Sequence, residues 1–154
     1  KAETFFKKAA SIKADAPEVN ANLALCELVK GNVASAEALL GKANGANAVN
    51  EALGNLYIKQ GQYDRAVATF GDVKTNSAAQ AQILAKDYNK AKATLSAVKN
   101  PDAMTDYLMA IVGARTNNAS LVSSSIKSAI AKDPSMAEKA ANDREFAKYA
   151  DAIK

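Results

Sequence analysis

The sequence contains no histidine, no tryptophan and a single cysteine, Cys26. Without histidine, the chain lacks the commonest general base and the commonest metal ligand of proteins. Cys26 has no second thiol for an internal disulfide and lies in an apolar helical segment, so we expect a small buried hydrophobic residue there. The sequence also contains no phosphate-cradling glycine loop and no metal-binding spacing of acidic residues. These absences argue against an enzyme, a metal site and a bound cofactor.

Long apolar runs and dense positive charge are also missing. No stretch approaches the roughly eighteen consecutive apolar residues that suggest a membrane-spanning helix, so direct membrane insertion is not expected. The net charge is only +4, and only three arginines occur. Nucleic-acid binding would need denser arginine and lysine interleaved with aromatic residues. The five lysines within residues 74–99 are therefore interpreted as a solvated helix surface, and nucleic acid is not expected as a partner.

What the sequence does contain is an internal repeat. Residues 19–40 align without a gap on residues 49–70, and the identical pairs include Gly31 with Gly61. A repeat of this length indicates one supersecondary unit that is copied and stacked, because a single copy cannot bury its own apolar face. The abundance of alanine and the absence of long period-two alternation favour helices throughout. The sequence therefore predicts an all-α chain of stacked helical units.

Each copy has the pattern of a helical hairpin, most clearly in residues 47–76. One apolar helical face is followed by a turn glycine and then by a second apolar face with spacings of three and four. This pattern resembles the tetratricopeptide repeat, although Asn50 stands where that family has tryptophan and the closing proline is missing. The residues that match the family pattern are Leu53, Gly54, Tyr57, Gly61, Tyr63, Ala66 and Phe70.

The resemblance implies a right-handed α-α superhelix, that is, a single solenoid domain of antiparallel helical hairpins. It covers nearly the whole chain and is most specific in the second full copy. The predicted divisions are a half repeat at 1–16, repeats at 17–46 and 47–76, a short repeat at 77–100, a degenerate repeat at 101–134 and C-terminal capping helices at 135–154.

The resemblance also implies a function, because the first helix of each hairpin in this family lines a concave groove. We therefore expect a non-catalytic scaffold or adaptor that binds a protein or peptide on that face. Ala21 and Leu25 occupy two positions that one subtype uses to grip a terminal carboxylate, so this grip is not expected here. The residues predicted to face the partner are Ala21, Asn22, Leu25, Leu28, Glu51, Asn55, Ile58 and Lys59.

A second resemblance supports an alternative. Residues 100–118 and 143–149 are similar to a repeat region of large cell-envelope proteins of Bacteroidetes. The chain begins at Lys1 and its first helix lacks a partner helix, so we expect a piece of a longer protein in which Phe5 faces an upstream hairpin. The alternative function is thus a structural spacer or assembly segment of a bacterial envelope protein. This resemblance favours a periplasmic or outer-membrane-associated location over a cytoplasmic one.

The repeat register predicts several local features. Helices should end near Gly31 and Gly61, and Gly54 should lie where the two helices of a hairpin touch. Asn100 and Asp133, which precede prolines, are candidate N-caps. The residues expected to face the last hairpin as a cap are Phe146, Tyr149, Ala150 and Ile153.

Overall fold

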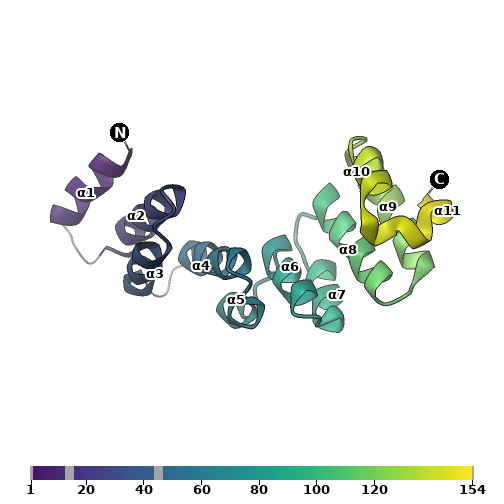
Figure 1. Cartoon of the computed structure of the whole chain (residues 1–154), viewed down its shortest axis with the longest axis horizontal. Helices are drawn as coiled ribbons and strands as arrows, with labels where there is room; N and C mark the ends of the chain where they lie inside the picture. The colour runs from purple at the N-terminus through teal and green to yellow at the C-terminus, as the bar shows by residue number, and fades with distance from the viewer. Residues whose placement is uncertain (1, 13–15, 44–46, 154) are drawn as a thin grey trace. The chain divides into compact units, whose positions relative to one another are not determined.

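A computed structural model describes residues 2–12, 16–43 and 47–153, and within these ranges every regular element is a helix, as the sequence predicts (Figure 1). Within each of the two compact units described below, consecutive helices pack on one another, as in a helical solenoid, whereas the right-handed superhelix stays a prediction. No helix in the described part of the chain is long and apolar enough to cross a membrane. The helices are α1 (Ala2–Ile12), α2 (Pro17–Val29), α3 (Val33–Lys42), α4 (Asn47–Lys59), α5 (Tyr63–Phe70), α6 (Asn76–Leu84), α7 (Tyr88–Ser96), α8 (Ala103–Arg115), α9 (Ala119–Lys132), α10 (Met136–Asn142), the 3-10 helix η1 (Arg144–Tyr149) and α11 (Ala150–Ile153).

The chain forms two compact units, residues 1–70 (unit 1) and residues 71–154 (unit 2). Unit 1 holds α1 and the hairpins α2–α3 and α4–α5. Unit 2 holds the hairpins α6–α7 and α8–α9, followed by α10, η1 and α11. The predicted single domain and its repeat divisions stay predictions.

All four hairpins turn with the same backbone geometry. Each turn has one residue with positive φ: Gly31 at 82°, Gly61 at 73°, Lys86 at 65° and Asn117 at 56°. In every turn this residue and the next one donate N–H bonds back to carbonyls of the preceding helix, which is the Schellman arrangement. The helix ends predicted at Gly31 and Gly61 are confirmed. The third hairpin, which has no turn glycine, uses Lys86 in the left-handed conformation instead.

The packing inside each hairpin repeats at fixed distances from its left-handed turn residue. A small residue stands seven positions before each left-handed residue, and a large apolar one stands nine positions after it. Both kinds are buried, so every hairpin brings two helix backbones close together and fills the space beyond with one large side chain. In chain order these pairs are Ala24 with Leu40, Gly54 with Phe70, Ala79 with Leu95, and Ala110 with Ile126.

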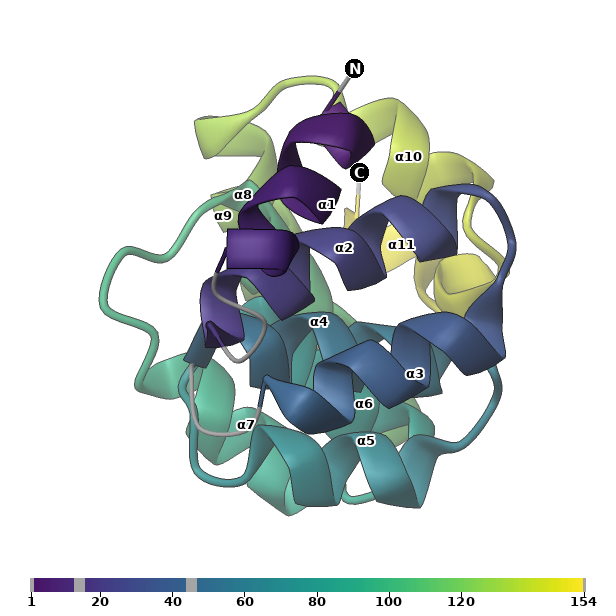
Figure 2. The same cartoon turned by 90° about the vertical axis from the view of Figure 1, so that its left-hand side faces the viewer.

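In unit 1, α1 lies beside α2, and the hairpin α2–α3 contacts α4 (Figure 2). A buried cluster that includes Ala24, Leu40 and Leu56 joins the two hairpins of this unit. Pro17 is the first residue of α2, where its missing N–H leaves no helix bond unmade.

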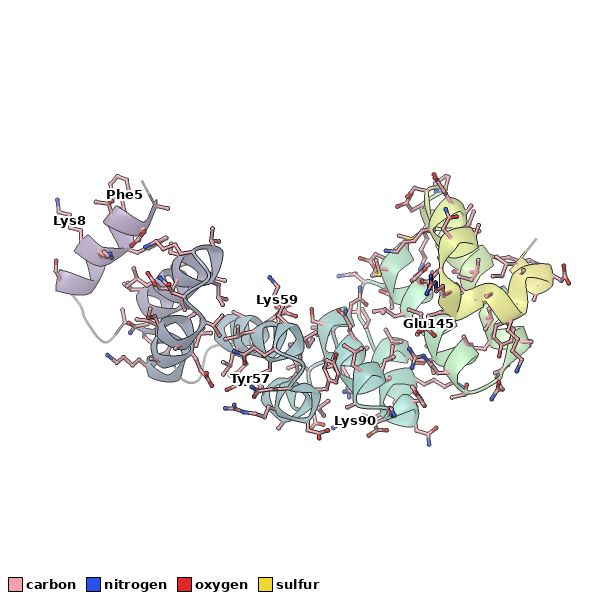
Figure 3. The ribbon with its side chains drawn as sticks, in the orientation of Figure 1. Phe5, Lys8, Tyr57, Lys59, Lys90 and Glu145 are labelled. Atoms are coloured by element: carbon pink, nitrogen blue, oxygen red, sulfur yellow. The ribbon has the colours of Figure 1, made fainter. Side chains whose placement is uncertain are left out.

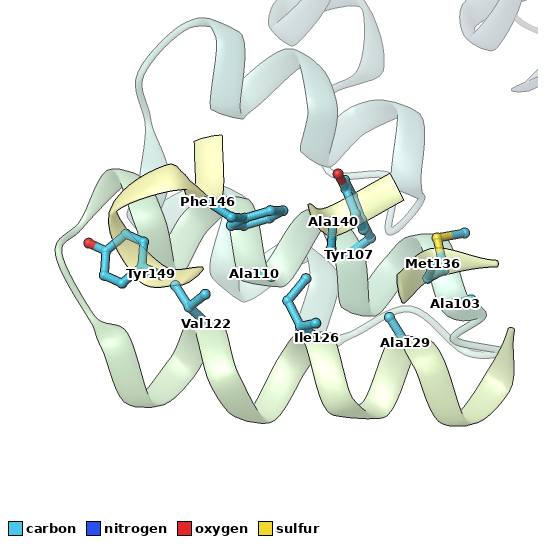
Figure 4. Close-up of a cluster of buried hydrophobic side chains, with 10 residues drawn as sticks. All are labelled: Ala103, Tyr107, Ala110, Val122, Ile126, Ala129, Met136, Ala140, Phe146 and Tyr149. Atoms are coloured by element: carbon cyan, nitrogen blue, oxygen red, sulfur yellow. The ribbon is translucent and has the colours of Figure 1, made fainter. Parts of the chain in front are cut away.

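In unit 2, the segment after α9 covers the last hairpin. Phe146 is only 1% exposed and packs edge-to-face on Tyr107, with ring centroids 5.4 Å apart (Figure 4). Tyr149 is buried in the same cluster and Ile153 packs against it. Ala150 is exposed and lines a pocket together with Phe146, Ile153 and Ile130 of α9.

Both predicted N-caps, Asn100 and Asp133, are wrong. The N-cap of α8 is Asp102 rather than Asn100, and its side chain forms a reciprocal capping box with Thr105. The N-cap of α10 is Ser135, while the Asp133 carboxylate accepts bonds from the Ser135 N–H and hydroxyl. In both cases the proline lies before the helix, so the capping residue comes later than predicted.

Candidate functional site

The four predicted partner-binding residues of α2 differ in their surroundings. Ala21 and Leu28 are partly buried and pack against the cluster of Ala24, Leu40 and Leu56. The Asn22 side chain donates to the Glu18 carbonyl, with an N–O distance of 2.9 Å. Leu25 is 47% exposed, so it presents the largest free apolar surface of the four.

The four predicted residues of α4 lie on a helix that α2 contacts. Glu51 and Lys59 are exposed, while Asn55 and Ile58 are partly buried. The Lys59 side chain projects away from the helix, on the same side of the view as Phe5 of α1 (Figure 3). The structure therefore places both predicted helices in one unit.

A pocket of about 380 Å³ lies between α1 and α2, and it takes in Asn22 and Leu25 from the predicted set together with Phe6 and Cys26. Glu3 of α1 ties the two helices together, since its carboxylate lies 2.6 Å from Lys30 Nζ and 2.7 Å from Lys7 Nζ. Hydrogen bonds from Lys30, and then from Lys7, lower the pKa of Glu3 to about 2. Cys26 is partly rather than fully buried.

Unit 2 contains a groove that the sequence analysis missed. Counted back from the left-handed turn residue, Ala21, Asn22 and Leu25 stand ten, nine and six positions before Gly31. All three positions line one groove of about 400 Å³ in both hairpins of unit 2. From α6 they contribute Asn76, Ser77 and Gln80, and from α8 they contribute Tyr107, Leu108 and Ile111.

The two walls of this groove, called the α6–α8 groove from here on, differ in chemistry. The α6 wall offers two amides and a hydroxyl, whereas the α8 wall offers aliphatic groups and the Tyr107 ring. Lys139 of α10 adds the one charged side chain of the lining, with Nζ 5.0 Å from the centroid of the Tyr107 ring. That distance is within the range of a cation–π contact.

Hydrogen bonds fix both walls. Asn76 Nδ2 donates to Asp102 at 3.1 Å, and Asn76 Oδ1 accepts from the Thr105 hydroxyl at 2.9 Å. Because Asp102 and Thr105 form the capping box of α8, the amide of Asn76 is held by the start of the opposite helix. The Tyr107 hydroxyl donates to Asp143, and burial followed by this bond raises the pKa of Tyr107 well above its usual value. The groove is thus largely preorganised.

The sequence has no histidine, and no group of three or more acidic or cysteine residues that would hold a metal occurs in the described residues. The lining combines neutral polar, apolar and one cationic group, which suits recognition of a chain segment.

The signal that could have revealed this groove was the repeat register. Lys86 replaces the turn glycine of the third hairpin, so no glycine marks the turn from which the α6 positions are counted. No protein-family model matches the chain, and no curated protein is significantly similar to it.

Proposed function

We propose that the chain is a non-catalytic interaction module that binds a peptide segment of a protein partner in the α6–α8 groove. The observation that carries this proposal is the repetition of one register. Three of the four positions predicted to face a partner in α2, those of Ala21, Asn22 and Leu25, have equivalents in α6 and α8 that line a single groove. The predicted residues themselves lie on α2 and α4 and are proposed as a further contact surface in unit 1, which includes Leu25, Asn55 and Lys59.

The chemistry of the groove favours a segment with an apolar side chain and an acidic one. Leu108 and Ile111 offer apolar surface, and burying a Leu-sized side chain contributes about 1.5–3 kcal/mol. Lys139 is exposed and its contact in the groove is with a neutral ring, so a carboxylate of the partner gains a charge-assisted bond there. Gln80 and Ser77 supply hydrogen bonds that set the register of the bound segment.

Selection from a random peptide library displayed on phage tests the proposal, with the full chain as bait. Selected peptides are synthesised, and their affinity is measured by fluorescence anisotropy for the parent chain, Ile111→Glu and Lys139→Glu. We expect acidic and apolar residues in the selected peptides and a loss of about tenfold or more in affinity for either variant. The exposed residue Lys92 of α7 lies outside the groove lining, so Lys92→Glu serves as the charge-matched control and should leave affinity unchanged.

The double variant Leu25→Glu, Asn55→Glu separates the two surfaces. If the selected peptides bind only this double variant more weakly than the parent, the peptide-binding site lies in unit 1. Peptides that bind the parent and all groove variants equally would contradict the proposal, provided that circular dichroism shows every variant to be helical.

A structural spacer or assembly segment of a larger bacterial envelope protein is the second candidate. It is favoured by a polar network that links the two hairpins of unit 1. Tyr57 donates to Glu37 at 3.2 Å, and Arg65 bonds to Tyr57 at 2.9 Å and to Glu37 at 3.2 Å while lying 4.3 Å from the Tyr57 ring centroid. Such cross-links stiffen consecutive hairpins, which is what a spacer needs. Failure to select any groove-dependent peptide would favour this candidate.

A further inference from the structure

Three side chains that follow α9 contact one residue of the groove lining, Tyr107. They belong to α10 and η1, residues 136–149, which are called the cap segment from here on. Lys139 Nζ lies 5.0 Å from the centroid of the Tyr107 ring, and Asp143 accepts the bond from the Tyr107 hydroxyl. Phe146 packs edge-to-face on the same ring (Figure 4). Because Tyr107 lines the α6–α8 groove, the cap segment is connected directly to the groove lining.

The two carboxylate oxygens of Asp143 bond to different elements. Its Oδ2 accepts from the Tyr107 hydroxyl, while its Oδ1 accepts from the Glu145 N–H at 2.9 Å and so caps η1. Tyr107 is only 2% exposed, so water cannot replace Asp143 as the acceptor unless the ring or the cap segment moves. One side chain therefore links the start of η1 to the orientation of the Tyr107 ring.

The Tyr107 ring in turn bears on Lys139. In the described part of the chain, the ring is the one interaction partner of the Lys139 ammonium, which is otherwise exposed. The cation–π contact thus holds a long and flexible side chain over the groove, and the orientation of the ring decides where the ammonium points.

The cap segment depends on such contacts for its structure. Its two helices have seven and six residues, and helices this short are not stable by themselves. Arg115 bonds to Glu145 and Lys148 donates to Asn117, but none of these four residues lines the groove. These pairs hold the cap segment on the last hairpin without contacting the groove.

We propose that Asp143 is a positioning residue of the groove, which acts through the Tyr107 ring to hold Lys139 where an acidic side chain of a bound peptide reaches it. The groove is then complete only while the cap segment is docked. This role rests on the proposed binding of peptides in the α6–α8 groove, and it identifies the element that controls the recognition of their acidic residue.

The link from Asp143 to Lys139 can be measured without a peptide. Protons above an aromatic ring have upfield NMR signals, so the ε-CH2 protons of Lys139 report the position of the Tyr107 ring. Asp143→Asn keeps an oxygen that caps η1 but weakens the bond to Tyr107, and it should move these signals toward their ordinary position. Asp133→Asn removes the same charge before α10, outside the groove lining, and should leave them unchanged. Unchanged Lys139 signals in Asp143→Asn would overturn the proposal, whether or not a peptide binds.

The second measurement uses a selected acidic peptide and its analogue in which the acidic residue is replaced by the amide. Fluorescence anisotropy should show Asp143→Asn binding the acidic peptide about fivefold or more weakly than the parent, and the amide analogue equally well. Loss of a negative charge would by itself favour an acidic peptide, so weaker binding has the opposite sign to a simple charge effect. Asp133→Asn is again the charge-matched control and should not weaken binding.

Tyr107→Phe tests whether Asp143 acts through the hydroxyl, because it keeps the ring and leaves the cap of η1 intact. It should weaken binding of the acidic peptide like Asp143→Asn, and the double variant should bind no more weakly than either single variant. Tyr107→Phe also provides the test if circular dichroism shows that Asp143→Asn has lost helical structure.

Two results would show a different role for Asp143. An equal loss of affinity for both peptides would indicate a general structural role, and additive losses in the double variant would show that Asp143 does not act through Tyr107. Either result would overturn the proposal. Failure to select any groove-dependent peptide would instead remove the proposed function, and the recognition role of Asp143 with it, even if the Lys139 signals move as expected.

Discussion

Gly54 and Phe70 form a size-matched pair inside the second hairpin. A Cβ atom on Gly54 would lie 2.5 Å from the Phe70 ring, which is far closer than carbon atoms pack. The other three hairpins place alanine opposite leucine or isoleucine at the same positions. Only the hairpin with the largest side chain therefore requires glycine, and this explains a glycine in the middle of α4 despite its unfavourable helix propensity.

This pairing predicts a compensating double substitution. Gly54→Leu should lower the free energy of unfolding by about 1–3 kcal/mol or more, because the added bulk forces the helices apart. Gly54→Ala should also destabilise, whereas Gly54→Ala combined with Phe70→Leu should recover much of the loss, since it recreates the pair of the other hairpins. Urea unfolding followed by circular dichroism measures the parent, Gly54→Leu, Gly54→Ala, Phe70→Leu and the double variant. If the double variant loses more free energy of unfolding than Gly54→Ala and Phe70→Leu lose together, size matching would be contradicted.

Lys86 offers a test of the turn. A residue with a Cβ atom is strained in the left-handed conformation by roughly 1–2 kcal/mol, and glycine is not. Lys86→Gly should therefore raise the thermal midpoint and the free energy of unfolding, by about 1 kcal/mol. Lys86→Ala is the control, because it removes the same exposed chain but keeps the Cβ atom. Equal stability of the two variants would show that the turn carries no such strain.

At the scale of the helices, the sequence predicted those elements whose turns contain glycine. Gly31 and Gly61 fixed the ends of α2 and α4, and Gly54 was correctly placed at a close contact. The third hairpin was harder to predict because an exposed lysine, Lys86, stands at the glycine position, and lysine has no local preference for the left-handed conformation. The α6–α8 groove was missed for the same reason. The polar network of Tyr57 was also missed, because the residues that complete it come from α3 and α5 and no spacing rule connects them.

The docking of α1 on α2 depends on pH through Glu3. Its pKa is lowered from the ordinary 4.5 to about 2, first by the bond from Lys30. A lowered folded-state pKa stabilises the docked form fully above pH 4.5, and this contribution is lost as pH falls toward 2. Lys30→Met should raise the pKa of Glu3, as measured by carbon-13 NMR of its side-chain carboxyl. Lys7→Met, which removes the second cause, should raise it less, and an unchanged value in Lys30→Met would contradict the assigned contact.

At the scale of the whole molecule, the compactness of units 1 and 2 predicts separable unfolding. In a chain of stacked hairpins each element is stabilised mainly by its neighbours, so a unit with its own buried clusters can keep its structure alone. The fragment of residues 71–154 should be helical and unfold cooperatively, because Phe146 and Tyr149 cover its last hairpin. Removing residues 143–154 from this fragment should expose the cluster that contains Phe146 and Tyr149, and the resulting aggregation is measured by light scattering.

In the full chain, Gly54→Leu should shift only the unfolding transition of unit 1, and Lys86→Gly should shift only that of unit 2. A single transition that moves with both substitutions would show one cooperative domain, as the sequence had predicted.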